Sequence, residues 1–208
     1  LDAFLVDQPE VHVPVSGKEK MHRRLGAVFA ALEQQVKLGA LGCYGISSFE
    51  GFRVETDAAV FQSITSLLGL AEKAAALVHG AGARHAFRIL QLPFNQAMTE
   101  GFTRFSQATG QGNVASTIQA AHQLRVYVMA THSMGKGVLA RQASDAVRVK
   151  LAALPNDARR ALQFNRSTPG IGTSLVGISD PAHLEDALAV ARLAPLPKAD
   201  YLALYERA

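Results

Sequence analysis

Few residues of this 208-residue chain stand at the spacings that common catalytic chemistries need. Its seven histidines include no H-E-x-x-H pair, and the single cysteine, Cys43, excludes an internal disulfide and a multi-cysteine metal site. Residues 45–48 begin like a G-x-S-x-G nucleophile turn but lack its final glycine. The Gly-Lys-Gly stretch at 135–137 is too short for a phosphate-cradling loop. The sequence therefore indicates no resident metal and no serine hydrolase.

One stretch has the form of a phosphate-binding turn. Gly177, Ile178 and Ser179 precede Asp180-Pro181, where an N-cap aspartate followed by proline predicts the start of a helix. Free backbone N–H groups at such helix starts bind phosphate, in β/α barrels above all. We therefore expect an anion to bind near residues 177–179, close to the carboxylate of Asp180.

The net charge limits the classes of partner that the chain is expected to bind. A net charge of +4 and a pI near 9.4 suit a protein that meets an anionic small molecule, and fall short of a basic nucleic-acid surface. No apolar run approaches the roughly 18 residues that would span a bilayer. We expect no nucleic-acid or membrane partner, and the single cysteine favours a reducing cytoplasm.

Short apolar runs alternate with longer helical patterns along the chain. The expected strands are 3–6, 41–46, 87–92, 126–130 and 174–177. The first expected helix follows a capping box formed by Ser16 and Glu19 and ends near Gly39. The other expected helices cover about 57–78, 112–123, 144–154, 157–166 and 180–193. Strands separated by roughly 40 to 50 residues, with helices between them, predict βα units and parallel pairing.

Two architectures accept five βα units. An open, doubly wound sheet is complete at this length, whereas an eight-unit barrel needs about 250 residues. Strand order separates the two, because a barrel keeps its strands in sequence order and a doubly wound sheet reverses direction.

Five stretches resemble segments of the aldo/keto reductases, which are NADPH-dependent enzymes on a (β/α)8 barrel. They are LDAFLVDQPE at 1–10, KLGALGCYGISSF at 37–49, LQLPFN at 90–95, VYVMATHSMGKGVL at 126–139 and the block at 161–188. They follow the family's own order. The resemblance implies an α/β fold of TIM-barrel type. Residues 1–208 would form one barrel domain that supplies strands four to eight and lacks the first three βα units, in agreement with a first residue, Leu1, that is not methionine.

The resemblance implies that most residues needed for carbonyl reduction lie outside residues 1–208. The family's tyrosine acid, lysine and aspartate belong to the first three units, and its histidine ends strand four, where this chain has Asp7. An ionised carboxylate cannot donate a hydrogen bond to a carbonyl. Asp7 is either a polar group at the mouth of the barrel, with a pKa that burial would raise, or a residue that turns the chain before Gln8-Pro9. We expect lost or altered reductase chemistry.

The cofactor implied by the resemblance is NADPH, with NADH as the alternative. The nicotinamide carboxamide would meet Ser47, Ser48 and Gln91, since a hydroxyl and an amide supply the donor and acceptor that it needs. Gln91 can equally be a polar residue of the barrel interior that bonds to its neighbours.

The remaining cofactor contacts follow the fourth and fifth expected strands. Thr131 stands where the family has an aromatic residue that stacks on the nicotinamide, His132 lies beside it, and Lys136 could reach the pyrophosphate. The positions near the adenosine and its phosphates are Gly177, Ser179, His183 and Asp186.

Three hypotheses remain open from the sequence. The first is an NAD(P)H-dependent oxidoreductase of the aldo/keto reductase type that acts on a carbonyl, with this chain carrying mainly the cofactor-binding half. The second is a catalytically degenerate barrel that serves as a binding or regulatory subunit, and the third is an unrelated five-stranded module. In the first two cases the isolated chain is expected to be inactive, and a complementary segment or a second copy is expected to cover the open barrel.

Overall fold

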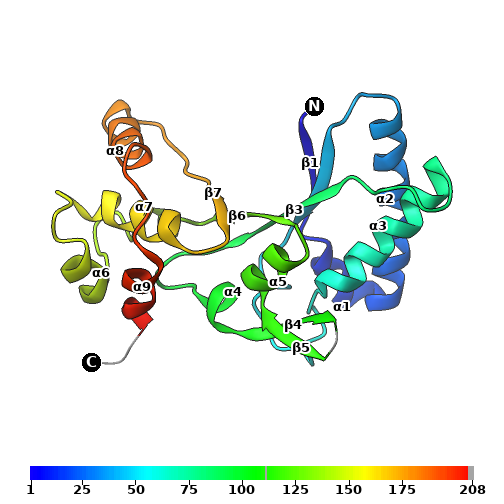
Figure 1. The fold of residues 1–208 in the computed structure, drawn as a ribbon, viewed down its shortest axis with the longest axis horizontal. Helices are drawn as coiled ribbons and strands as arrows, with labels where there is room; N and C mark the ends of the chain where they lie inside the picture. Colours follow the sequence, from blue (N-terminus) through cyan, green and yellow to red (C-terminus); the bar gives the residue numbers. More distant parts are fainter. Residues whose placement is uncertain (111, 206–208) are drawn as a thin grey trace. The chain divides into compact units, whose positions relative to one another are not determined.

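Five parallel strands in sequence order form the main sheet. The computed structural model describes residues 1–110 and 112–205. Strands β1 (Ala3–Asp7), β2 (Cys43–Ser47), β3 (Phe87–Pro93), β6 (Tyr127–Thr131) and β7 (Ile171–Ser174) are neighbours in the order β1-β2-β3-β6-β7 (Figure 1). The order never reverses, so the barrel architecture predicted from the motifs is confirmed over the doubly wound alternative.

The chain divides into two compact units, which are described separately. The first comprises residues 1–92 and 100–128, and the second comprises residues 93–99 and 129–208. No helix in the described ranges is long and apolar enough to cross a membrane.

Helices α2 (Lys18–Lys37) and α3 (Ile64–His79) lie side by side in the first unit (Figure 1). The ring of Phe29 on α2 packs 5.1 Å from the ring of Tyr44 and 5.5 Å from that of Phe87. The Tyr44 hydroxyl donates a 2.8 Å hydrogen bond to Glu33 of the same helix. These contacts place Tyr44 and Phe87 on the helix-covered face of the sheet, so residues that alternate with them face the other way.

The shorter elements of the first unit differ from the sequence prediction. A two-stranded antiparallel hairpin, β4 (Phe105–Gly110) with β5 (Asn113–Ser116), occupies the start of the predicted helix 112–123. That helix, α5 (Thr117–Gln123), begins only after Ser116, whose side chain closes a capping box with Gln119. The other short elements are a 3-10 turn (Pro9–His12), α1 (Val13–Ser16) and α4 (Glu100–Thr103).

The predicted capping residue at the start of α2 is wrong, whereas the predicted end of this helix is correct. Ser16 does not cap α2, because its hydroxyl donates to the carbonyl of His12, and the N-cap is Gly17. The predicted end near Gly39 is confirmed: Gly39 adopts φ of 71°, and the N–H groups of Gly39 and Ala40 bond to the carbonyls of Val36 and Gln35, as in a Schellman motif.

Helix α3 begins later than its apolar pattern predicts. Its N-cap is Ser63, which accepts from the N–H of Ser66, so residues 57–63 precede the helix and are not part of it. Gly69 lies inside α3 and does not break it.

The second unit combines β7 with short helices. They are α6 (Asp145–Lys150), α7 (Asp157–Ser167), α8 (Pro181–Ala191), α9 (Lys198–Leu202) and two 3-10 turns (Gly135–Gly137 and Ala203–Tyr205). Of these, α7 packs against β7. Asp180 caps α8 as predicted, because its carboxylate accepts from the N–H of Ala182 at 2.8 Å. The fifth strand lies at Ile171–Ser174, three residues before its predicted position at 174–177.

Candidate functional site

The register of the first unit aligns polar residues at the ends of three neighbouring strands. Asp7 pairs with Ser47, and Ser47 pairs with Gln91, so the three form one row across β1, β2 and β3. Ser47 lies three residues after helix-facing Tyr44 and therefore points to the opposite face of the sheet. Asp7 and Gln91 share that face because they pair with Ser47, the latter through the register shift between Tyr44 and Gly45. The amide nitrogen of Gln91 donates to the Ser47 hydroxyl at 3.0 Å. This row presents an amide oxygen, a hydroxyl and a carboxylate together.

Asp7 sits at the exposed end of this row. Its carboxylate contacts only the amide of Gln8, at 3.4 Å, among the described side chains. Gln8 adopts the left-handed conformation, with φ of 43°, and its N–H bonds to the carbonyl of Ser47. The chain therefore turns sharply directly after Asp7, and the carboxylate is not held by a cation or a buried donor.

Ser48 has a structural role. It is 2% exposed, and its hydroxyl donates to Glu10 Oε1 at 2.6 Å while accepting from the N–H of Gly51 at 2.9 Å. Glu10 is 3% exposed and also accepts from the N–H groups of Phe49 and Glu50. A ligand could reach the Ser48 hydroxyl only after this network opened, so Ser47 and Gln91 are the accessible members of the predicted carboxamide contact.

The second unit contains a pocket of about 860 Å³. The residues that the sequence assigned to cofactor binding and that line it are Thr131, His132, Lys136, Gly177, Ser179, His183 and Asp186. The pocket thus collects residues from the turn after β6, the segment after β7 and the first turns of α8. Its volume falls within the range of small-molecule sites.

Two buried asparagines shape the β6 side of this pocket. Asn95, 1% exposed, donates to the carbonyl of His132 at 2.8 Å. Asn165, which is fully buried, donates to the carbonyls of Phe94 and Ser133 at 3.1 and 3.4 Å. Because both donors are held in the core, the turn that follows Thr131 has a fixed backbone path.

The same turn contains residues in an unfavourable backbone conformation. His132 and Lys136 have φ of 54° and 56°, in the left-handed region that non-glycine residues rarely adopt. Such conformations cluster at ligand sites, where surrounding contacts hold them. Ser133, in the same turn, lines the pocket, and its hydroxyl is buried with no hydrogen-bond partner among the described residues.

The pocket carries an excess of positive charge. Lys136 and Arg141 line it, and neither has an acidic side chain within ion-pair distance in the described part of the chain. Asp186 is neutralised by Arg159 at 2.7 Å and accepts from the amide of Asn156. Burial alone would raise the pKa of Asp186, but the hydrogen bonds from Arg159 and Asn156 outweigh it and hold the pKa below its usual range.

The start of α8 offers fewer free donors than the sequence suggested. The Asp180 carboxylate takes the N–H of Ala182, and the Asp180 carbonyl accepts from the N–H groups of His183 and Leu184. An anion at residues 177–179 would therefore have to bind the side chains of Ser179, His183 and Lys136 more than the helix N-terminus.

Comparisons with solved structures identify the fold. A thermostable aldo-keto reductase crystallised with the inhibitor epalrestat superposes with a TM-score of 0.59 at 12% identity, covering 98% of this chain and 58% of that protein. The holo form of the aldo-keto reductase AKR11C1 from Bacillus halodurans gives a TM-score of 0.58 at 13% identity, covering 99% of this chain and 60% of its own. No family model and no curated protein matches.

This chain has the aldo/keto reductase fold. It spans about three fifths of the length of these reductases. Within that fold, the pocket lies after the carboxyl ends of β6 and β7. β/α barrels carry their sites at this end of the strands.

Carbonyl reduction also needs a proton donor, and none of the four tyrosines lines the pocket. Tyr44 and Tyr201 are fully buried. Tyr205 is half-buried, and Tyr127 is exposed at the start of β6, at the other end of that strand from Thr131. Burial, together with the hydrogen bond to Glu33, raises the pKa of Tyr44, and burial raises that of Tyr201. Among the described residues, no group of His, Cys, Asp or Glu side chains is placed to hold a metal ion.

Sequence reasoning missed several residues of the pocket in the second unit. Arg141 and Asn156 line it without belonging to any motif, and Ser133 lies within the stretch 126–139 but was not singled out. Asn156 had a usable signal, since an asparagine directly before the predicted helix at 157 is a typical N-cap, and it does accept from the N–H of Arg159. Arg141 had none, because it follows an irregular segment with no periodic pattern.

Proposed function

We propose that this chain carries the cofactor-binding part of an NAD(P)H-dependent oxidoreductase of the aldo/keto reductase type that acts on a carbonyl substrate. The observation that carries the proposal is the pocket of the second unit, which brings together most of the residues that the family resemblance assigned to the dinucleotide. Lys136 and Arg141 supply positive charge for phosphate groups.

The residues present suit a nicotinamide dinucleotide but do not favour the 2′-phosphate that distinguishes NADPH from NADH. Arg159 is committed to Asp186, and Asp180 places a carboxylate at the start of α8. NADPH is the cofactor proposed first, and NADH is the alternative that this charge pattern allows. When bound, the dinucleotide supplies the hydride, while the chain's own residues bind and orient it. The Ser47–Gln91 pair can hold an amide group, because it offers a hydroxyl and an amide in fixed register.

The alternative function is a catalytically degenerate binding or regulatory subunit of the same fold. Asp7 favours it, because an exposed carboxylate stands where the resemblance expects a histidine that donates to the carbonyl. Thr131 favours it as well, since a threonine cannot stack on a nicotinamide ring. In both cases the single cysteine points to the cytoplasm as the proposed compartment.

Titration with NADPH tests the cofactor-binding proposal. We expect NADPH fluorescence to change on titration with the 208-residue chain, and Lys136→Gln to weaken binding about 5- to 10-fold through the loss of a charged phosphate contact. Lys198→Gln, which removes an exposed lysine of α9 outside the pocket, is the matched control.

The chain alone is expected not to oxidise NADPH with a reactive aromatic aldehyde. General acids contribute about 10²–10⁴-fold to such steps, and no tyrosine of the chain lines the proposed cofactor pocket. Turnover near one per second would overturn the view that the acid lies outside this chain. No binding of NADPH or NADH would overturn the proposal itself.

A further inference from the structure

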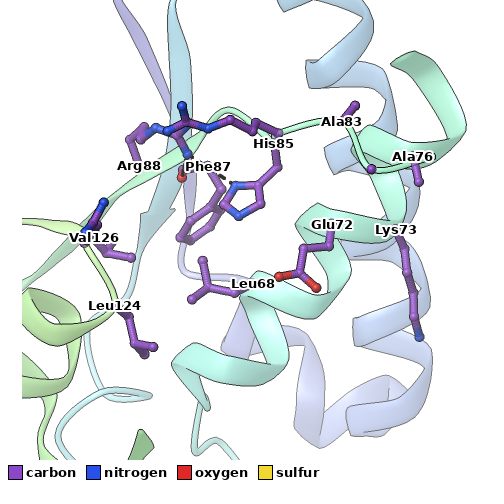
Figure 2. A pocket seen from close by; sticks show the side chains of 13 residues that line it. Leu68, Glu72, Lys73, Ala76, Ala83, His85, Phe87, Arg88, Leu124 and Val126 are labelled. Carbon is purple, nitrogen blue, oxygen red and sulfur yellow. Dashed lines mark hydrogen bonds between the residues drawn. The ribbon is translucent and has the colours of Figure 1, made fainter. Parts of the chain in front are cut away.

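A second cavity, of about 670 Å³, lies entirely within the first unit. Figure 2 shows His85 and Phe87, at the start of β3, directed toward Leu68 and Glu72 of α3. The segment that precedes β6 closes the third side with Leu124. The cavity shares no residue with the proposed cofactor pocket or with the Ser47–Gln91 pair.

The cavity also lies at a different end of β3 from the residues assigned to the nicotinamide. Phe87 is the first residue of β3, whereas Gln91 lies near the carboxyl end of the same strand. Barrel enzymes place their reaction centres at the carboxyl ends of the strands. A ligand in this cavity would therefore bind at the other end of β3 from the residues assigned to the nicotinamide.

Cationic side chains outnumber acidic ones around the cavity. The cationic side chains that line it are Lys73, Arg84, Arg88 and Arg125, and the only acidic one is Glu72. None of these cations has a carboxylate within 4.0 Å among the described residues. Lys73 points away from His85 in Figure 2, so it contributes at longer range than the arginines.

Arg88 is the cation built into the wall. Its side chain is half-buried, and Nη1 donates to the carbonyl of Phe87 at 2.7 Å and lies 3.4 Å from His85 Nδ1. One nitrogen of the guanidinium is thus fixed by the backbone, and the others remain free to bind an oxyanion. Leaving such a group half-buried without a counter-ion is costly, and an anionic ligand would relieve that cost.

The floor of the cavity is apolar. Phe87 and Val126 are 1% and 5% exposed, and Leu68 and Leu124 are half-buried beside them. A cationic rim above an apolar floor suits a ligand with a charged end and a hydrophobic body. The volume of about 670 Å³ lies in the range of small-molecule sites.

We propose that this cavity binds a small organic anion, a phosphate or carboxylate group carried on an apolar or aromatic body. The guanidinium of Arg88 takes the oxyanion, Arg125 and Arg84 add charge at the rim, and the body packs on Leu68 and Leu124. This site is independent of the proposed cofactor function.

Calorimetric titration of the 208-residue chain with phenyl phosphate tests the site. We expect a dissociation constant of about 1 mM or tighter, and at least about tenfold weaker binding of inorganic phosphate and of benzyl alcohol, which each lack half of the ligand. Benzoate in a parallel titration decides between a carboxylate and a phosphate as the preferred anion. Inorganic phosphate binding as tightly as phenyl phosphate would overturn the role of the apolar floor.

Matched variants locate the binding. Arg88→Gln is expected to weaken phenyl phosphate binding about tenfold and Arg125→Gln about threefold, whereas Arg23→Gln, an exposed arginine of α2 outside the cavity, leaves it unchanged. Lys136→Gln is also expected to leave it unchanged, which separates this site from the cofactor pocket. Circular dichroism checks that each variant folds. Equal binding by Arg88→Gln, Arg125→Gln and the wild type, or a loss confined to Lys136→Gln, would overturn the proposal.

Discussion

Glu33 shows how one buried side chain can organise several elements. The carboxylate is fully buried on α2 and accepts from the Tyr44 hydroxyl and from the N–H of Ala86, both at 2.8 Å, while its second oxygen lies 2.9 Å from His79 Nε2. It therefore links α2 with β2, with the end of α3 and with the segment that enters β3. Buried charges of this kind are tolerated only when their partners are in place.

Removing that carboxylate leaves its partners buried and unpaired. Glu33→Ala is expected to lower the free energy of unfolding by about 2–4 kcal/mol, measured by urea denaturation followed by circular dichroism. Glu19→Ala, an exposed position of the same helix, is the control and should change it by less than about 1 kcal/mol. Equal effects of the two substitutions would show that the buried network does not stabilise the unit.

Asp157 makes part of the second unit's stability depend on pH. Its carboxylate accepts from Arg148 at 2.5 Å, from Arg160 at 2.8 Å and from the N–H of Ala143 at 3.2 Å. The hydrogen bond from Arg148, and then that from Arg160, hold the pKa of Asp157 well below its usual range. The folded chain thus binds this proton more weakly than the unfolded chain does.

The sign of the pH dependence follows from that depressed pKa. The stabilisation is complete above the unfolded pKa of about 3.9 and is lost as the pH falls below it. Asp157→Asn should lower the urea midpoint at pH 7, and the gap to the wild type should narrow toward pH 3. Asp145→Asn, whose carboxylate is fully exposed, should produce little change at either pH. A gap that stayed constant from pH 7 to pH 3 would contradict this assignment.

At the scale of elements, the close pairing of β2 and β3 depends on Gly45. A Cβ at this position would lie 2.0 Å from the carbonyl oxygen of Ile89, next to the irregular register between Tyr44 and Gly45. No side chain fits there unless the two strands separate. Gly69 in α3 is the opposite case, because a Cβ there would meet nothing within 4 Å.

This contrast gives a paired prediction. Gly45→Ala should lower the free energy of unfolding by about 3 kcal/mol or more, since backbone atoms obstruct the added methyl group. Gly69→Ala should raise it by about 0.5–1 kcal/mol, because alanine is the better helix former. Urea denaturation of both variants is the measurement. Similar stabilities for the two would mean that the strands can separate at little cost.

The same scale shows where sequence reasoning worked and where it could not. Strands β1, β2, β3 and β6 were predicted within one or two residues, because each is an apolar run bounded by polar or turn residues. Strand β7 was placed on the apolar residues Leu175 and Val176, but hydrogen bonding to β6 selects Ile171–Ser174 and continues only as the Leu175 N–H to Ala130. Pairing with a neighbour, which no local pattern encodes, decided that boundary.

The hairpin and Ser48 likewise depend on tertiary contacts that the local sequence does not encode. β4 and β5 carry little apolar alternation, and only the glycines at 110 and 112, with φ of 98° and 77°, signalled a turn. The row of Asp7, Ser47 and Gln91 follows from strand register, and the family motifs had already named its members. Ser48 could not be separated from Ser47 in this way, since its burial against Glu10 is a tertiary contact.

At the scale of the whole molecule, the strands in sequence order leave β1 paired only with β2 among the described strands. Phe4 on β1 is 44% exposed, and Leu5 is half-exposed on the other face. An unpaired strand with apolar side chains is a template for association. The predicted partner, a second copy or a complementary segment, remains a proposal.

Sedimentation velocity over a range of concentrations tests that association. We expect the 208-residue chain to form dimers or larger species at micromolar concentration, and Phe4→Lys to weaken their formation because a charge on an edge strand opposes pairing. Leu77→Lys, at a position 79% exposed on α3, is the control and should not. A stable monomer at all concentrations would contradict the prediction.

The most direct test of the central claim is to map where NADPH binds, by following the backbone amide signals of the isotope-labelled chain during titration. The account predicts that the perturbed signals cluster in the turn after β6, near Thr131, His132 and Lys136, and in the segment from Gly177 to His183. Signals near Arg88 and Leu124 should not move at the concentrations that saturate the first set. Perturbations confined to the cavity beside α3, or none at all, would contradict the assignment of the dinucleotide to the second unit.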